Sequence, residues 1–166
     1  MKIKGKAIKL GDNINTDFII SGRYKFSITD MKVLAEHIME DIDPEFPKKI
    51  IPGSSIIVAG NNFGMGSSRE QAPLVIKEAG ITAVLSKKFA RIFYRNSFNI
   101  GLPLLEVDTD KIDESDELEI DLDNGAVSNL TKKTKLKTGR VPKFMQELLR
   151  EGGVVNHYLK HGELKI

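Results

Sequence analysis

The sequence contains no cysteine among its 166 residues. A disulfide framework, a thiolate metal site and an iron–sulfur cluster ligated by this chain are therefore excluded. Long apolar runs are also missing, since none approaches the roughly 20 residues that a membrane-spanning helix needs. The basic N-terminal stretch MKIKGKAIKLGD lacks the apolar centre of a signal peptide, so we expect a cytoplasmic protein that does not bind a membrane.

The chain has no strong excess of charge of either sign. Its 25 basic and 23 acidic residues leave a formal net charge of +2. This balance argues against nucleic acid as a partner. Histidine is scarce, and two of the three histidines, His157 and His161, are four residues apart. Their segment NHYLKHG is polar and lacks the glutamate of a zinc-protease motif, so the sequence predicts no metal site there.

What remains is the composition of an ordinary globular protein, with 40% hydrophobic and 29% charged residues. The length suits one domain with a hydrophobic core. No repeat, low-complexity tract or linker divides the chain. We therefore expect a single α/β domain over residues 1–166.

Hydrophobic periodicity and turn residues predict the elements of this domain. The expected elements are strands at 2–9, 54–60, 81–86 and 102–108, helices at 30–40, 69–79, about 87–97 and 142–152, an irregular connection at 43–49, a solvated acidic loop at 108–117, and a hairpin that turns at Asn124-Gly125. Residues 54–60 and 81–86 are continuously apolar, as in strands buried on both faces. A strand, a helix and a strand joined by short links predict a right-handed parallel crossover.

The junction between the second strand and its helix carries the chemistry. It reads NNFGMGSSREQAP, residues 61–73. A P-loop would need a lysine that is missing here, and the dinucleotide fingerprint would need a third glycine where Arg69 stands. Two interpretations stay open: Ser67 and Glu70 form a capping box, or the helix N-terminus and Arg69 bind a carboxylate. In the second case, the positive potential of the helix N-terminus and Arg69 would stabilise a serine alkoxide. That alkoxide could take a proton from the carbon next to a carboxylate.

Several motifs resemble one known family over residues 2–160. They are GSSRE at 66–70, FARIFYRN at 89–96, NIGLPLL at 99–105 and NINTD at 13–17. Together they resemble the small subunits of isopropylmalate isomerases and the swivel domain of the aconitase superfamily. The resemblance implies a swivelling β/β/α fold and the dehydration and rehydration of a small dicarboxylic 2-hydroxy acid. It further implies a separate large subunit that carries a 4Fe-4S cluster, with no cofactor bound by this chain, which would be inactive alone.

The same resemblance implies the roles of individual residues. Ser67 corresponds to the catalytic base, Ser68 to a supporting hydroxyl, and Arg69 to a ligand of a substrate carboxylate. Asp17 corresponds to an acid that orients Arg69 or the substrate, and Thr16 beside it is a weaker candidate; without the resemblance, Asp17 could equally close an Asx turn. Arg91 and Arg95, four residues apart, suit a solvated helix face, and Arg95 with Asn96 could brace the glycine loop; we leave them out of the catalytic set.

The loop SGRYKFSIT, residues 21–29, carries the substrate choice in this family. The candidate contacts are Arg23, Tyr24, Lys25, Phe26 and Ser27. Members that act on isopropylmalate tend to be apolar after the Arg-Tyr pair, whereas homoaconitase-like members have an arginine there; Lys25-Phe26-Ser27 matches neither pattern. Phe26 could contact a branched alkyl group and Lys25 a third carboxylate, and we favour the alkyl group because an exposed lysine needs no partner.

Three hypotheses follow. The first is the small subunit of an isopropylmalate isomerase in leucine biosynthesis. The second is the small subunit of a related hydro-lyase that acts on homoaconitate, methylmalate or citraconate, or 2,3-dimethylmalate. The third is a non-catalytic anion-binding module in which Ser67 is only a helix cap.

Overall fold

The computed structural model describes residues 1–164, and all of their side chains except that of Lys25. The strands are β1 (Lys2–Lys9), β2 (Ser55–Val58), β3 (Ile81–Ser86), β4 (Leu104–Glu106), β5 (Glu117–Asp121), β6 (Ala126–Asn129) and β7 (Thr134–Lys137). The helices are α1 (Thr16–Ile19), α2 (Gly22–Lys25), α3 (Met31–Ala35), α4 (Phe46–Lys49), α5 (Gln71–Glu78), α6 (Arg91–Asn99), α7 (Lys143–Glu151) and α8 (Val154–His161), with a 3₁₀ turn η1 (Thr109–Lys111).

Within residues 1–164, the seven strands form one mixed sheet in the order β4-β3-β2-β1-β5-β6-β7. Strands β1 to β4 are parallel, with Lys6 opposite Ser55 and Val58 opposite Leu85. Strands β5 to β7 continue from β1 as an antiparallel meander. This is the α/β fold that the resemblance implies, with a β/β/α arrangement.

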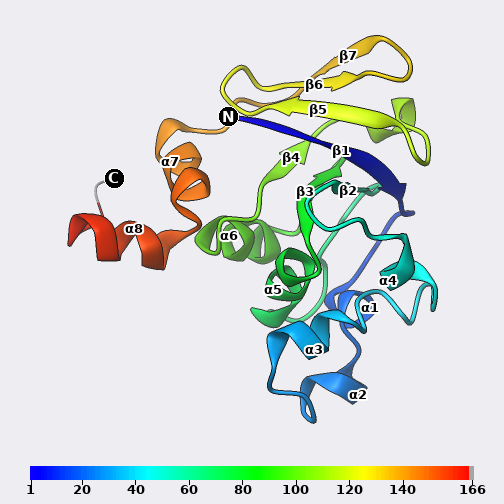
Figure 1. Cartoon of the computed structure of the whole chain (residues 1–166), viewed down its shortest axis with the longest axis vertical. Helices are drawn as coiled ribbons and strands as arrows, with labels where there is room; N and C mark the ends of the chain where they lie inside the picture. The colour runs from blue at the N-terminus through cyan, green and yellow to red at the C-terminus, as the bar shows by residue number, and fades with distance from the viewer. Residues whose placement is uncertain (165–166) are drawn as a thin grey trace.

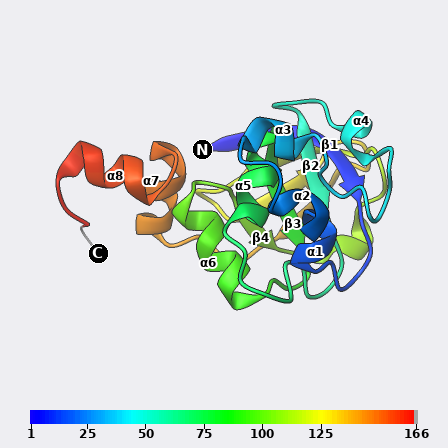
Figure 2. The ribbon, with the colours of Figure 1, turned by 90° about the horizontal axis from the view of Figure 1, so that it is seen from below.

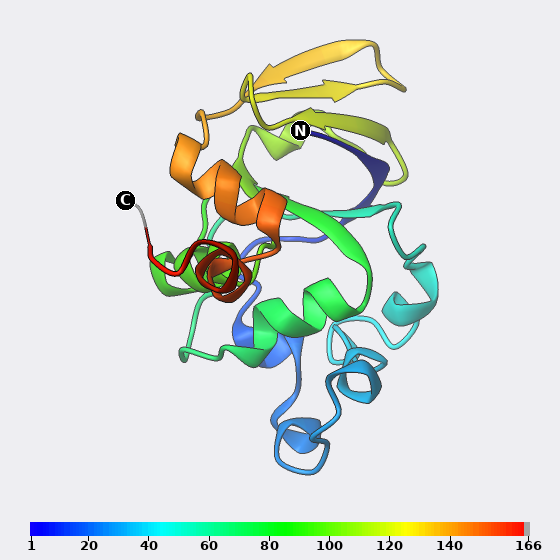
Figure 3. The ribbon, with the colours of Figure 1, turned by 60° about the vertical axis from the view of Figure 1, so that its left-hand side comes forward.

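The parallel strands are buried because helices cover them. Every residue of β2 is buried, as its apolar sequence SIIV predicts. Helices α1 to α6 lie on the side of the parallel strands that faces away from β5 to β7 (Figures 1 and 2). Helices α7 and α8 lie beside α6 (Figure 3), and α8 projects away from the sheet (Figures 1 and 2). None of the helices in residues 1–164 combines the length and hydrophobicity of a membrane span.

The predicted helix over 30–40 is wrong in its length. Asp30 caps α3 by accepting hydrogen bonds from the backbone N–H groups of Lys32 and Val33. The helix ends at Ala35, and the chain reaches a left-handed conformation at Met39, with φ of 58°. The spacing of Val33, Leu34, Ile38 and Met39 indicates one buried helix face, but Val33 is 42% exposed. A helical period therefore continued in the sequence beyond the point where the backbone leaves the helix.

Three further predictions need correction. The connection over 43–49 contains α4, whose Phe46 is buried. The acidic loop over 108–117 is only partly solvated, because Asp116 is 5% exposed and accepts hydrogen bonds from Asn129 and from a backbone N–H. Strand β7 was not predicted, because only Leu136 in it is both apolar and buried.

Candidate active site

The glycine junction lies at the carboxyl ends of β1, β2 and β3, where ligands bind in open α/β sheets. Segments that follow these strands extend the pairing by isolated bridges, Asn15 with Met65 and Phe63 with Phe89. The N–H of Gly64 donates to Ile14 O at 2.7 Å. Three chain segments therefore meet at one point, with the serine-bearing turn between the other two.

Glycine is required at position 64 for two reasons. Gly64 has a φ of +78°, which side chains rarely adopt, and an added Cβ would lie 2.2 Å from Cγ of Phe93 on α6. Gly66 also has a positive φ, at +97°. The backbone can thus approach α6 closely and turn sharply just before Ser67.

The serine hydroxyls are not helix caps. The N-cap of α5 is Glu70, and it makes no side-chain capping bond. The Ser67 hydroxyl oxygen instead accepts a hydrogen bond from Arg69 Nε at 3.1 Å. Both Ser67 and Ser68 are exposed. The capping-box interpretation is wrong, and the regular helix begins at Gln71.

Arg69 connects the turn to α1. Its Nη1 forms an ion pair with the Asp17 carboxylate and lies 3.4 Å from Ile20 O. The Arg69 side chain is 14% exposed, so the contacts hold it in place, whereas that of Asp17 is 56% exposed. Asn15, and not Asp17, caps α1 by accepting a hydrogen bond from Phe18 N at 2.9 Å. The structure thus places Asp17 beside Arg69, as the resemblance implies, and not in an Asx turn.

An open pocket of about 320 Å³ lies over this turn. Its walls include Thr16, whose hydroxyl donates to Ser67 O at 3.0 Å. The residues along it with ligand-binding chemistry are Ser67, Ser68, Arg69, Arg91 and Asn96, and Ile92 adds an apolar surface. A serine hydroxyl and two arginines at the rim of an open hollow can receive a small organic anion.

Arg91 and Asn96 are pocket residues that the sequence analysis left out. Both lie on α6, which begins at Arg91 without a side-chain cap, so its first N–H groups add positive potential. Their signal in the sequence was the motif FARIFYRN, which contains both residues. Arg95, four residues after Arg91, does not line the pocket. Position along a helix could not show which of the two arginines faces the junction.

The loop over 21–29 is not part of this pocket. It contains α2, and Arg23 is ion-paired with Asp41. The Ser27 hydroxyl donates to Arg23 O at 3.0 Å. Phe26 is 84% exposed, and the Lys25 side chain lies outside the described part of the chain. Of the ten predicted site residues, the structure therefore brings together Thr16, Asp17, Ser67, Ser68 and Arg69, but not those of the loop.

Tyr24 joins this loop to the segment after α3. Its ring stacks on His37 with the centroids 3.9 Å apart. A hydrogen bond to Glu40 raises the pKa of Tyr24. Burial raises the pKa of Glu40, but hydrogen bonds from His37 and Tyr24 outweigh it and leave that pKa below its usual value. The contacts hold α2 against the segment that follows α3.

Comparison with known proteins places this geometry in a family. The family model of the aconitase C-terminal domain matches residues 13–110. The chain is 55% identical over 166 residues to 3-isopropylmalate dehydratase small subunit 2 of Archaeoglobus fulgidus, covering 100% of both chains. It is 57% identical over 157 residues to the 3-isopropylmalate dehydratase small subunit of Thermodesulfovibrio yellowstonii, covering 93% and 92% of the two chains.

A solved structure gives the same result. The fold matches the crystal structure of a 3-isopropylmalate dehydratase from Methanocaldococcus jannaschii with a TM-score of 0.92 and 48% identity. The match covers 98% of this chain and 96% of the other. The chain therefore belongs to the aconitase C-terminal domain family and, within it, to the 3-isopropylmalate dehydratase small subunits.

Proposed function

We propose that this chain is the small subunit of a cytoplasmic hydro-lyase, 3-isopropylmalate dehydratase, which interconverts 2- and 3-isopropylmalate in leucine biosynthesis. The observation that carries the proposal is the exposed Ser67 hydroxyl, which Arg69 holds at an open pocket. The family membership supports the reaction class and implies a large-subunit partner.

In this proposal, Ser67 removes the proton beside a substrate carboxylate. The Nε–H of Arg69 points at the Ser67 oxygen and stabilises the negative charge that develops there. Arg69 Nη2 has no partner among residues 1–164 and can donate to a substrate carboxylate. Asp17 keeps the guanidinium in that orientation, and the Ser68 hydroxyl is exposed beside it.

The other half of the site would come from the large subunit. The family implies a 4Fe-4S cluster, and this chain has no cysteine to hold one, so we place it on the partner. There it would supply a Lewis acid for the substrate hydroxyl. Phe18 and Ile92, 41% and 47% exposed, lie next to Asp17 and Arg91 and suit contact with a partner surface. The chain alone would therefore be inactive.

A related hydro-lyase is the second candidate, because of the loop over 21–29. Lys25-Phe26-Ser27 matches neither the isopropylmalate nor the homoaconitase pattern. Homocitrate, citramalate and 2,3-dimethylmalate are therefore the competing substrates. Conversely, an anion-binding module in which Ser67 is only a cap has lost its support, because Glu70 stands at the N-cap position of α5 and the Ser67 hydroxyl bonds to Arg69.

The test is the substrate profile of the enzyme rebuilt with its large subunit. Rates should be compared for 2-isopropylmalate, citramalate, 2,3-dimethylmalate and homocitrate, with the wild type and with Lys25→Ala. We expect 2-isopropylmalate to be used best and Lys25→Ala to affect all four substrates equally. A preference for homocitrate that Lys25→Ala abolishes would instead show that Lys25 binds a third carboxylate and that the second candidate is right.

A further inference from the structure

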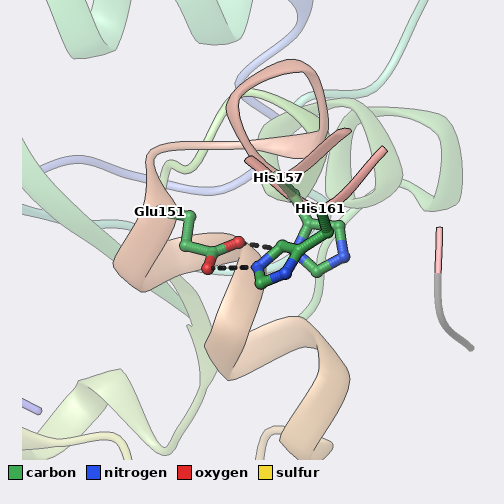
Figure 4. Close-up of side chains that lie close together, drawn as sticks. All are labelled: Glu151, His157 and His161. Carbon is green, nitrogen blue, oxygen red and sulfur yellow. Dashed lines mark hydrogen bonds and ion pairs between the residues drawn. The ribbon is translucent and has the colours of Figure 1, made fainter. Parts of the chain in front are cut away.

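The C-terminal arm holds a cluster of ligand-type side chains far from the glycine junction in sequence. Gly152 and Gly153, with φ of 82° and 120°, reverse the chain between α7 and α8. The turn brings Glu151, the last residue of α7, to His157 and His161 on α8 (Figure 4). One oxygen or nitrogen atom from each of the three lies within 4.8 Å of the others. The histidine pair, for which the sequence predicts no metal site, thus gains a third potential ligand.

The glutamate carboxylate is the centre of the cluster. Its Oε2 lies 2.5 Å from His157 Nδ1, and its Oε1 lies 2.9 Å from His161 Nε2. Lys160 Nζ also donates to Oε1, at 2.8 Å. Figure 4 shows both imidazole rings beside the two carboxylate oxygens. Two imidazole nitrogens and one carboxylate therefore converge on a single point.

A second observation concerns the buried ring. The His157 side chain is 5% exposed, and its Nε2 is buried with no hydrogen-bond partner within residues 1–164. A neutral imidazole has one lone pair, which is what a metal ion requires. Because no group within residues 1–164 accepts from or donates to Nε2, nothing there opposes a proton on that nitrogen when Nδ1 binds an ion.

We propose that Glu151, His157 and His161 bind a divalent transition-metal ion of the zinc class. Two imidazoles and one carboxylate form a donor set that zinc uses in proteins, with a fourth position left for water. The ion binds the ring nitrogens that now face the carboxylate, and the proton on each of these nitrogens moves through solvent to the other nitrogen of its ring. It binds His157 through Nδ1, which leaves the Nε2 proton on the side of the ring away from the carboxylate.

The cluster can reach this geometry by side-chain motion alone. Tetrahedral coordination with bonds of 2.0–2.2 Å places neighbouring ligand atoms about 3.3 Å apart. The present hydrogen-bonded contacts, 2.5 and 2.9 Å, must therefore open by less than about 1 Å, and the two ring nitrogens, which lie within 4.8 Å of each other, must approach by at most about 1.5 Å. The side chains of His161 and Lys160 are 40% and 64% exposed, so they can rotate and open a path from solvent. The bound ion then fixes α8 against α7.

Calorimetric titration of the full chain, prepared without a histidine tag, with Zn²⁺ tests the proposal. We expect saturable binding of one ion per chain and a higher melting temperature with Zn²⁺. His161→Ala is the main variant, because its exposed side chain can be removed with little effect on folding. It and Glu151→Gln should each weaken binding at least tenfold. His37→Ala is the matched control, since His37 pairs with Glu40 without a third ligand.

Two results would overturn the proposal. The first is an absence of saturable Zn²⁺ binding by the wild type. The second is equal affinity in the wild type, His161→Ala and His37→Ala, which would place the ion elsewhere. Co²⁺ gives an independent readout, because tetrahedral coordination produces strong visible absorption that octahedral coordination does not. Lys160→Ala should bind at least as tightly as the wild type, and loss of binding in it would contradict the ligand assignment.

Discussion

The substitution Gly64→Ala tests how the serine-bearing turn is built. A non-glycine residue at the φ of +78° costs roughly 1–2 kcal/mol. The new Cβ would also lie 2.2 to 2.7 Å from three atoms of Phe93, an overlap that costs about 1–3 kcal/mol to relieve. We therefore expect a loss of about 2–5 kcal/mol in the free energy of unfolding. For a chain of this size, the melting temperature should fall by about 4–20 °C.

Calorimetry or urea unfolding of the isolated chain measures this effect without the large subunit. The control is Gly11→Ala, because a Cβ at Gly11 meets no atom within 4 Å and that glycine has no positive φ. We expect the control to change stability by less than about 0.5 kcal/mol. If the two variants were equally stable, the close approach of the turn to α6 would not exist and the geometry of the pocket would have to be rejected.

Three further predictions concern carboxylates. Asp17→Asn should lower kcat/KM of the rebuilt enzyme about 10²-fold, because it releases Arg69. The free energy of unfolding should change by less than about 1 kcal/mol, because the Asp17 side chain is 56% exposed. Wild-type activity in Asp17→Asn would refute the positioning role of Asp17. Asp116→Ala should cost about 1–3 kcal/mol in urea unfolding, because it leaves the buried Asn129 Nδ2 without its acceptor and removes the acceptor of a half-buried backbone N–H. A neutral result would contradict that network. Burial raises the pKa of Asp116, but its hydrogen bonds and Lys132 outweigh this and hold that pKa below the usual 3.8. The contribution of the ionised Asp116 carboxylate to the free energy of unfolding should therefore be complete above about pH 4 and disappear as the pH falls further. Urea midpoints measured from pH 2 to 6 should fall less on acidification in Asp116→Asn than in the wild type.

Much of the fold could be predicted from local sequence because burial and chain reversal leave clear patterns. The continuous apolar runs of β2 and β3 predicted parallel strands, and Gly80 and Gly152 mark the ends of α5 and α7. The helix over 30–40 was predicted too long because its end depends on a tertiary contact. Met39 N donates to Ile19 O at 3.0 Å. Because Ile19 lies outside residues 30–40, the sequence pattern of that segment cannot indicate this contact.

The candidate site was predictable where its residues share a motif. Ser67 and Arg69 are two residues apart, and the resemblance supplied Asp17 from a distant motif. Arg91 was left out because its four-residue spacing from Arg95 suits a solvated helix face, and only the meeting of α6 with the glycine turn brings it to the pocket. That residues 1–166 form a single domain stays a prediction.

The turnover of Ser67→Ala in the enzyme rebuilt with its large subunit tests the central claim most directly. Ser68→Ala, the adjacent exposed hydroxyl, is the matched control. Loss of the base should reduce kcat on 2-isopropylmalate by about 10²–10⁴-fold, far more than in Ser68→Ala, with the unfolding free energy of the isolated chain unchanged within about 0.5 kcal/mol. A Ser67→Ala enzyme that turns over near the wild-type rate would show that some other group takes the proton.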